Sequence, residues 1–374
     1  MTLNASGAVH PKGILYGMVV GLWCVFIASC MPVQAQNSNV VPSTADRAAT
    51  YMAERVSKDH FSGTVLVAKS GHIIFQQGYG LANREWDAPN TSKTIFRIAS
   101  ITKQFTAAAI LILQQENKLS VQEKVSKYLP DLPKAWNAVT VHQLLTHTSG
   151  IPNYMDAPRM DQLGRSSVTP ELLLALVQDK PLAFAPGSKW GYSNTNYLLL
   201  AMLVEKLSGE PYEEFLTAKI LQPLHLGATG YDRPEQIVPE RASPYIFKDG
   251  RWTNAPQLDL SVLSGAGGLH SNVEDLFTWF GALQDDKILS EASRKAMFSI
   301  YPETAVNGEY EGYGVIIAQD GEQPVYITTG NITGFSSAEF DYPKTGVCVI
   351  VLSNLDKAPT VAMGSQLAGI MSSQ

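Results

Sequence analysis

The stretch from Gln104 to Leu113 constrains the fold of this chain more than any other. Its residues form helices readily and are too apolar for a surface helix, so this helix must lie inside a large core. Ser100 and Lys103 come directly before it, three residues apart. Residues at this spacing share one face of a helical turn, with about 5–6 Å between their Cβ atoms. We therefore expect a serine and a lysine side by side at the start of a buried helix.

This pair suits nucleophilic chemistry. The hydroxyl of Ser100 would lie near the positive end of the helix dipole, and a buried lysine is a suitable base toward a neighbouring serine. The pattern Ser-x-x-Lys is short, however, and most copies of it are ordinary helix starts. Its interpretation depends on partner residues elsewhere in the chain.

Composition limits the classes of function. The chain has 374 residues, of which 45% are hydrophobic, which is ample for a large core. The formal net charge of -6 argues against nucleic acid as a partner. The 7 histidines form no His-Glu-x-x-His motif, and His142 and His147 do not share a helical face. No metal or other cofactor is indicated.

An apolar run from Gly13 to Cys30 follows Lys12, which is the layout of a secretory signal peptide. We expect residues 1–35 to be this signal, with cleavage after the small residue Ala35. A bacterial lipoprotein signal that ends before Cys30 is a second interpretation. A retained membrane helix is a third, disfavoured because no basic residues follow the run. The first two predict an exported protein, either periplasmic or anchored to a bacterial envelope.

The cysteines exclude a disulfide framework. Cys24 falls within the signal, so at most Cys30 and Cys348 remain in the mature protein. Cys348 lies in an apolar strand and is most simply a core residue. We therefore expect no structural disulfide and, under the lipoprotein interpretation, a lipid anchor at Cys30.

Strand patterns occur at both ends of the chain, with helical patterns between them. Two early strands flank a short turn, which indicates a hairpin. Four more strands precede a helix that follows Pro359. The expected strands are 63–68, 72–77, 312–318, 324–329, 337–342 and 347–352.

This order predicts an α+β fold of the α/β sandwich type. Its antiparallel sheet would be formed by the N- and C-terminal segments and flanked by helices, with a mainly helical lobe inserted. We expect one domain over residues 36–374. Its α/β lobe would span about residues 45–98 and 300–374, and its helical lobe about residues 99–299.

Tyr192 and Asn194 lie two residues apart in an extended stretch, so their side chains point the same way, as the wall of a cleft requires. Alone, Tyr-x-Asn is uninformative, and Asn194 is equally suited to capping the next helix. Together with Ser-x-x-Lys, and with the stretches 144–152 and 187–194, it is specific. The chain resembles the serine β-lactamase and penicillin-recognising family. It is most similar to the branch of class C β-lactamases, D-alanyl peptidases and related esterases.

The resemblance covers nearly the whole mature chain and implies roles for individual residues. Ser100 would be the nucleophile, and Lys103 and Tyr192 would relay its proton. Asn194 would form hydrogen bonds in the cleft, and Tyr154 would line the pocket.

The family also places Lys-Thr-Gly or His-x-Gly on a strand that lines the site. A literal Lys344-Thr345-Gly346 occurs, but only one strand and one helix follow it, whereas two strands and a helix follow the family's motif. The segment Tyr326–Gly330 has the required order and places Thr328 where the family has lysine or histidine. The cation that binds a substrate carboxylate is then missing, which puts β-lactamase and carboxypeptidase activity in doubt.

On this alignment the substrate-binding strand contributes Thr328, Thr329 and Gly330, followed by Asn331. The resemblance implies that the backbone N–H groups of Ser100 and Asn331 hold a developing oxyanion.

Another serine motif deserves comparison. Residues 334–338 nearly match the Gly-x-Ser-x-Gly elbow of α/β-hydrolases, with Ser336 as nucleophile. That elbow needs a helix after the serine, whereas a strand is expected after this one. We therefore prefer Ser100. His147 is more simply a structural hydrogen-bonding residue than a base.

We expect an exported serine hydrolase that forms an acyl-enzyme with an ester, an amide or a β-lactam-like compound, most simply an esterase or a D-alanyl peptidase-like enzyme. The rival is a catalytically weak or inactive penicillin-binding-like protein that recognises cell-wall peptides. Thr328 favours the rival, whereas Ser100, Lys103 and Tyr192 favour the enzyme. In both cases the partner is a small-molecule or peptide acyl compound.

Overall fold

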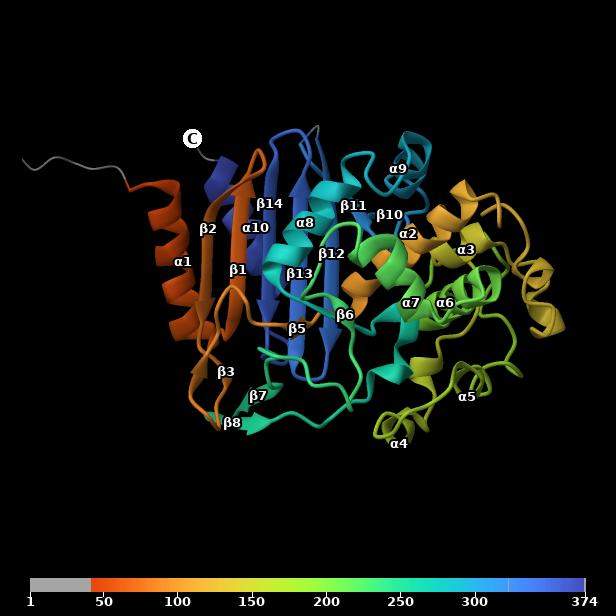
Figure 1. The fold of residues 1–374 in the computed structure, drawn as a ribbon, viewed down its shortest axis with the longest axis horizontal. Helices are drawn as coiled ribbons and strands as arrows, with labels where there is room; N and C mark the ends of the chain where they lie inside the picture. The colour runs from red at the N-terminus through yellow and green to blue at the C-terminus, as the bar shows by residue number, and fades with distance from the viewer. Residues whose placement is uncertain (1–41, 322, 373–374) are drawn as a thin grey trace, which may run out of the picture. The chain divides into compact units, whose positions relative to one another are not determined.

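The two ends of the chain meet in one antiparallel sheet (Figure 1). The computed structural model describes residues 42–321 and 323–372. The sheet has 7 strands in the order β10-β11-β12-β13-β14-β1-β2. They are β1 (Gly63–Lys69), β2 (His72–Tyr79), β10 (Tyr310–Glu311), β11 (Ile316–Asp320), β12 (Gln323–Ile332), β13 (Phe335–Tyr342) and β14 (Val347–Ser353). Because β1 pairs with β14 along its whole length, the predicted sheet from both termini is confirmed.

Helices cover both faces of this sheet. The valines at odd positions of β14 share a core with Met52 of α1 (Thr44–Asp59) and Leu367 of α10 (Thr360–Ser372). The even positions, such as Ile350, point to the other face, where α8 (Val273–Leu283) contacts β1 and β14. Figure 1 shows α8 in front of the strands and α10 behind them. Burial on both faces explains why β14 is apolar from Val347 to Leu352, and Cys348 is buried there with no disulfide partner among the described residues.

The helix expected from the apolar stretch is α2 (Thr102–Gln115), and its residues from Thr102 to Leu113 are all buried. It packs against α6 (Asn194–Ser208) and, through Phe105, on Trp279 of α8, with 4.1 Å between the ring centroids. The other helices are α3 (Val141–Leu145), α4 (Met160–Leu163), α5 (Pro170–Leu174), α7 (Tyr212–Leu216) and α9 (Glu291–Met297).

Three short strands form a small sheet at the segment that leads into α2. They are β5 (Phe96–Arg97), β9 (Leu269–Ser271) and β6 (Gly230–Tyr231), in that order. A short 3-10 turn, η1 (Ala99–Ile101), follows β5 and runs into α2. Two hairpin-like pairs complete the strands: β3 (Leu81–Asn83) with β4 (Ala88–Pro89), and β7 (Tyr245–Lys248) with β8 (Arg251–Asn254).

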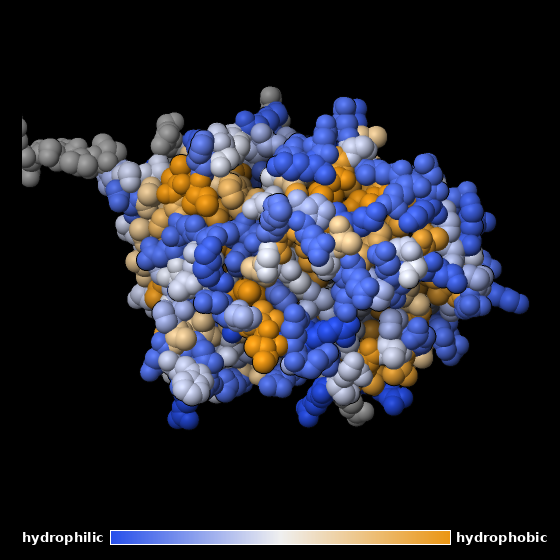
Figure 2. Space-filling view, viewed as in Figure 1, coloured by the Kyte–Doolittle hydropathy of each residue, from blue (hydrophilic) through white to orange (hydrophobic). Residues whose placement is uncertain are grey.

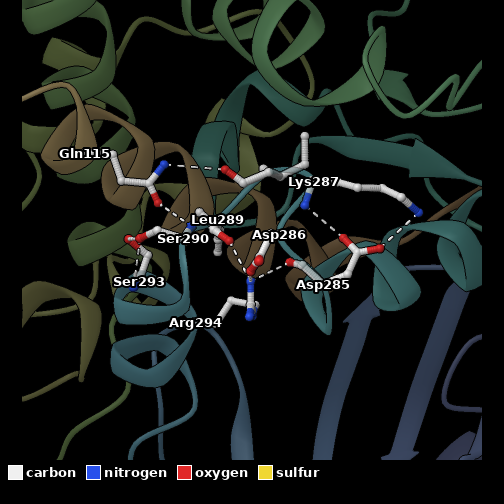
Figure 3. A network of polar contacts seen from close by, with 9 residues as sticks. Gln115, Asp285, Asp286, Lys287, Leu289, Ser290, Ser293 and Arg294 are labelled. Atoms are coloured by element: carbon white, nitrogen blue, oxygen red, sulfur yellow. Dashed lines mark hydrogen bonds and ion pairs between the residues drawn. The ribbon is translucent and has the colours of Figure 1, made fainter.

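The loop between α8 and α9 is fixed to the end of α2 (Figure 3). Gln115, the last residue of α2, accepts a hydrogen bond from the backbone N–H of Ser290 at 2.8 Å. Arg294 of α9 donates to the carbonyl oxygens of Asp285 and Leu289 at 2.7 and 2.9 Å and forms an ion pair with Asp286. These bonds satisfy backbone groups of the loop and hold α9 beside α2.

One strand differs clearly from its prediction. The strand expected from Gly312 begins only at Ile316. Gly314 has φ +72, and a Cβ there would lie 2.7 Å from the carbonyl oxygen of Lys103. The chain therefore turns closely around the start of α2 before the strand begins, a conformation that glycine permits.

Within the two described ranges, no helix combines the length and apolar character that crossing a bilayer requires. The expected signal peptide and the lipoprotein alternative at Cys30 lie outside the described residues and stay predictions. Figure 2 shows a mainly hydrophilic face on which apolar side chains form separate patches.

Candidate active site

Ser100 lies in η1, immediately before α2, as its sequence position predicts. The preceding residue, Ala99, has φ +47, a left-handed conformation that is uncommon for any residue other than glycine. Such strain persists only where neighbouring contacts hold it in place. Here the carbonyl oxygen of Ile98 is held by the hydroxyl of Ser337 on β13, at 3.0 Å.

The strand β12 lies directly against this turn because residue 330 is glycine. A Cβ on Gly330 would lie 2.2 Å from the carbonyl oxygen of Ile98 and 3.0 Å from the backbone nitrogen of Ser100. The Ser337 hydroxyl is also within 3.2 Å of the Gly330 carbonyl oxygen, so it bridges η1 and β12. This contact brings residues that are far apart in the sequence into one site.

Lys103 is 4% exposed, and its Nζ has three hydrogen-bond acceptors. These are Ser100 Oγ at 3.1 Å, Asn194 Oδ1 at 3.0 Å and the carbonyl oxygen of Ala266 at 2.7 Å. An ammonium group has three donors, so this set satisfies it fully. The Ala266 contact could not be predicted, because only the folded loop brings that carbonyl to α2.

Tyr192 is the second side chain, after Lys103, that contacts the hydroxyl of Ser100. Its hydroxyl lies 2.8 Å from Ser100 Oγ, and Lys103 Nζ lies 4.8 Å from the centre of its ring. Because Lys103 donates to Ser100 Oγ, the hydroxyl proton of Ser100 is free to point toward Tyr192. The structure thus brings the predicted Ser100, Lys103 and Tyr192 together.

His147 holds the Tyr192 segment in place. Its Nδ1 accepts from the backbone N–H of Ser193 at 3.2 Å, and its carbonyl oxygen accepts from Gly191 at 2.8 Å. Its ring lies 4.6 Å from that of Tyr192. Burial and the nearby charge of Lys103 lower the pKa of His147 well below its usual value, so the ring stays neutral near pH 7. The predicted structural role agrees with these contacts.

Asn194 is the first residue of α6, and the capping position belongs to Ser193. The Asn194 side chain bonds Lys103 through Oδ1, and its backbone N–H donates to Asn153 Oδ1 at 3.1 Å. Asn153, which the sequence did not single out, therefore orients the residue that holds the lysine.

Thr328 points toward α2, where its hydroxyl accepts a hydrogen bond from Gln104. Gln104 in turn accepts from the indole N–H of Trp279 at 3.0 Å. Glu339 pairs with Thr328 across β12 and β13 and is 1% exposed. Burial raises the pKa of Glu339 well above its usual value, and its Oε2 has no partner among the described residues. A buried acid thus lies beside Thr328, the position at which the sequence prediction places the family's lysine or histidine.

The side chains around Ser100 line a cavity of about 300 Å³ that is open to solvent. The predicted site residues that line it are Ser100, Lys103, Tyr192, Thr328, Thr329 and Asn331. Asn194, Gly330 and Tyr154 are not among its described lining residues. For Tyr154 this corrects the prediction: it is 0% exposed, and its hydroxyl donates to the carbonyl oxygen of Val262 at 2.6 Å. The turn after Ile151-Pro152 directs this ring into the core instead of the cleft.

Glu311 lines the same cavity and was missed by the sequence analysis. It is 4% exposed, and its Oε2 accepts from the indole N–H of Trp190 at 2.9 Å. Burial raises its pKa to about 8, although the bond from Trp190 and the charge of Lys103 act in the opposite direction. Nothing in the sequence separates this glutamate from those on the surface.

Replacing Gly330 by alanine tests the contact between β12 and η1. The added Cβ would collide with the Ile98 carbonyl, so strand and turn must separate. We expect Gly330→Ala to slow covalent reaction at Ser100 with a serine-directed probe by about 10²-fold or more, the usual effect of losing one oxyanion donor. The control is Gly281→Ala on α8, where a Cβ meets nothing within 4 Å. An unchanged rate in Gly330→Ala would contradict the proposed contact.

Glu311 also predicts a pH dependence of stability. Its pKa is about 8 when folded and 4.5 as the reference value, so between these values the folded protein retains a proton that the unfolded chain loses. This contribution to stability is lost as pH rises through that window. Glu311→Gln removes the titration, so urea unfolding should show the variant gaining stability relative to the wild type from about pH 5 to about pH 8. Parallel curves for the two proteins would contradict the buried state of this carboxyl.

Comparison with known proteins agrees with this geometry. The Beta-lactamase family model matches residues 46–368. A penicillin-binding protein of Bacillus subtilis is 30% identical, over 80% of this chain and 69% of that protein. The crystal structure of a penicillin-binding protein from Bacillus halodurans has a TM-score of 0.78 and 28% identity, covering 86% of this chain and 99% of that chain.

An enzyme structure is also similar. A D-stereospecific amidohydrolase from Streptomyces sp. has a TM-score of 0.74 and 26% identity, covering 87% of this chain and 98% of that chain. The family match extends over most of the chain and includes both the large sheet and the segments that carry Ser100, Lys103 and Tyr192. The chain therefore belongs to the beta-lactamase family of serine hydrolases.

Proposed function

We propose that this protein is an exported hydrolase in which Ser100 forms an acyl-enzyme with an ester or amide. One observation carries the proposal: Ser100 Oγ lies 2.8 Å from the Tyr192 hydroxyl and 3.1 Å from Lys103 Nζ, inside a cavity. A nucleophile within hydrogen-bond reach of a proton relay, itself oriented by other groups, is the arrangement that nucleophilic catalysis needs. Export is supported by the signal pattern before residue 36.

The reaction has two halves. Ser100 Oγ attacks the carbonyl carbon, Tyr192 passes the hydroxyl proton to the leaving group, and the bond to that group breaks. Water then attacks the acyl-enzyme, and its proton returns through Tyr192 to restore Ser100. Lys103 donates to Ser100 Oγ at 3.1 Å, so it holds the serine oxygen in place beside Tyr192, its partner in the relay. General acid–base groups of this kind contribute about 10²–10⁴-fold.

The oxyanion would be held by the backbone N–H groups of Ser100 and Asn331. Support comes from Gly330, which lets β12 come so close that a Cβ there would lie 3.0 Å from the nitrogen of Ser100. Two N–H groups from η1 and the end of β12 can then converge on one oxygen.

The cavity favours acyl compounds without a carboxylate. Apart from His147, which burial keeps neutral near pH 7, Lys103 is the one basic side chain among the described lining residues, and its donors are already engaged. Thr328 offers a short neutral hydroxyl that already bonds Gln104. A neutral ester or amide needs no cation here, and the similar D-stereospecific amidohydrolase supports an amide as one option. The cell-wall-binding alternative shares this gap but does not explain the intact relay.

Labelling with a fluorophosphonate tests this function. We expect the folded mature protein to gain the mass of one adduct, which peptide mapping places on Ser100. Ser100→Ala should abolish labelling, whereas the control Ser336→Ala should retain it, because Ser336 is a buried residue of β13. An adduct on Ser336, or none in folded protein, would favour the elbow motif or the non-hydrolytic alternative.

The absent cation predicts substrate preference. The wild type should hydrolyse a neutral p-nitrophenyl ester with a higher kcat/KM than a matched ester that carries a carboxylate. Thr328→Lys should raise the anionic-to-neutral ratio by about 10-fold, whereas the uncharged control Thr328→Gln should not. Adding Glu339→Gln should raise the ratio further, because Glu339 lies opposite position 328 and would otherwise pair with the lysine.

The reverse preference in the wild type would contradict this account. It would mean that a cation from another part of the chain binds the substrate carboxylate, while Ser100 could still be the nucleophile.

A further inference from the structure

Glu311 places a carboxyl group in the wall of the cavity that contains Ser100. It lies on β10, an edge strand of the large sheet. Its backbone N–H donates to the carbonyl oxygen of Pro302, and its carbonyl oxygen accepts from the N–H of Tyr301, both at 3.0 Å. The side chain is therefore presented to the cavity by an ordered strand. None of the acylation steps described above uses it.

Half of this carboxyl group has no partner in the described part of the chain. Oε2 accepts from Trp190, whereas no hydrogen bond joins Oε1 to any described residue. Glu339 provides a contrast, because its Oε2 is both buried and unpartnered, while Glu311 has no such atom. The free oxygen of Glu311 is thus open to the cavity and available to a ligand.

Among the described lining residues, no charged side chain forms an ion pair with Glu311 either. Lys103, the other charged residue of its described lining, directs its three donors to Ser100, Asn194 and Ala266. His147 is neutral near pH 7, because burial lowers its pKa. Burial raises the pKa of Glu311 to about 8, as expected for a carboxyl group without a cation bonded to it. A ligand that brings a positive charge would supply this missing partner.

A purely structural role does not require a carboxyl group. The indole N–H of Trp190 needs one acceptor oxygen, which a glutamine would provide at the same place and with the same shape. Burying an acid where an amide suffices costs free energy. The acid is therefore better explained by a bound cation.

We propose that Glu311 binds an ammonium group of the substrate, so that this hydrolase prefers acyl compounds with a free amine to analogues without one. This inference rests on the proposed function, because it specifies the substrate class of the same site. Near pH 7 the empty site holds Glu311 mainly as the protonated acid, which releases its proton to solvent when the ammonium binds. The ammonium would then donate to the free oxygen of Glu311 while the scissile carbonyl lies at Ser100. Glu311 is then a residue that determines specificity and takes no part in proton relay.

The test measures how the mature full-length protein hydrolyses a matched set of p-nitroanilide substrates. The D and L forms of alanine p-nitroanilide carry the amine, propionyl p-nitroanilide lacks it, and N-acetylalanine p-nitroanilide blocks it. Wild type is compared with Glu311→Gln, which keeps an acceptor for Trp190, and with Glu309→Gln. The latter makes the same side-chain substitution two residues away, outside the cavity lining. The readout is the ratio of kcat/KM for amine-bearing and amine-free substrates, at one pH near 7.

We expect the wild type to favour at least one enantiomer of the free-amine substrate by about 10- to 100-fold, the range of a charged hydrogen bond. Glu311→Gln should bring this ratio close to 1, mainly through KM, and Glu309→Gln should leave it as in the wild type. A wild type without preference, or a preference that survives Glu311→Gln, would overturn the inference even if Ser100 is acylated. Absence of turnover on every substrate, together with no fluorophosphonate adduct at Ser100, would overturn the proposed function and this inference with it.

Discussion

The site depends on one close contact, between the strand β12 and the turn that carries Ser100. Gly330 permits it, since a Cβ there would lie 2.2 Å from the carbonyl oxygen of Ile98. Ser337 bridges the two backbones, and the strained Ala99 is held between them. The sheet built from both ends of the chain thereby fixes the nucleophile at the start of the central buried helix.

Buried polar groups around this contact set the charge of the site. Position 328 carries a threonine that bonds Gln104, and Glu339 lies opposite it. A cation introduced at this point would face the buried Glu339. Glu311 adds a second buried acid inside the cavity. The described lining of the site is therefore poor in free positive charge, which supports the proposed preference for neutral or amine-bearing substrates over carboxylates.

Local patterns allowed much of this to be predicted. The spacing of Ser100 and Lys103, the apolar α2 and the alternation in the strands depend on neighbours in the sequence, and the structure agrees with them. Tyr154 was misplaced because loop direction depends on packing, which drew its ring into the core. Glu311 and the carbonyl of Ala266 were missed because their relevance arises only when distant segments meet at α2. Long-range backbone contacts leave no periodic signal in a single sequence.

The most direct test is the mass of the protein during turnover. Rapid acid quenching of the wild type with a p-nitrophenyl ester, followed by intact-mass measurement, should show the substrate's acyl group on Ser100 within the first turnover. Tyr192→Phe retains the ring beside Lys103 but loses the hydroxyl, so acylation should slow by about 10²–10⁴-fold while the fold remains. Acylation of this variant at the wild-type rate, or turnover without any acylated Ser100, would contradict the account.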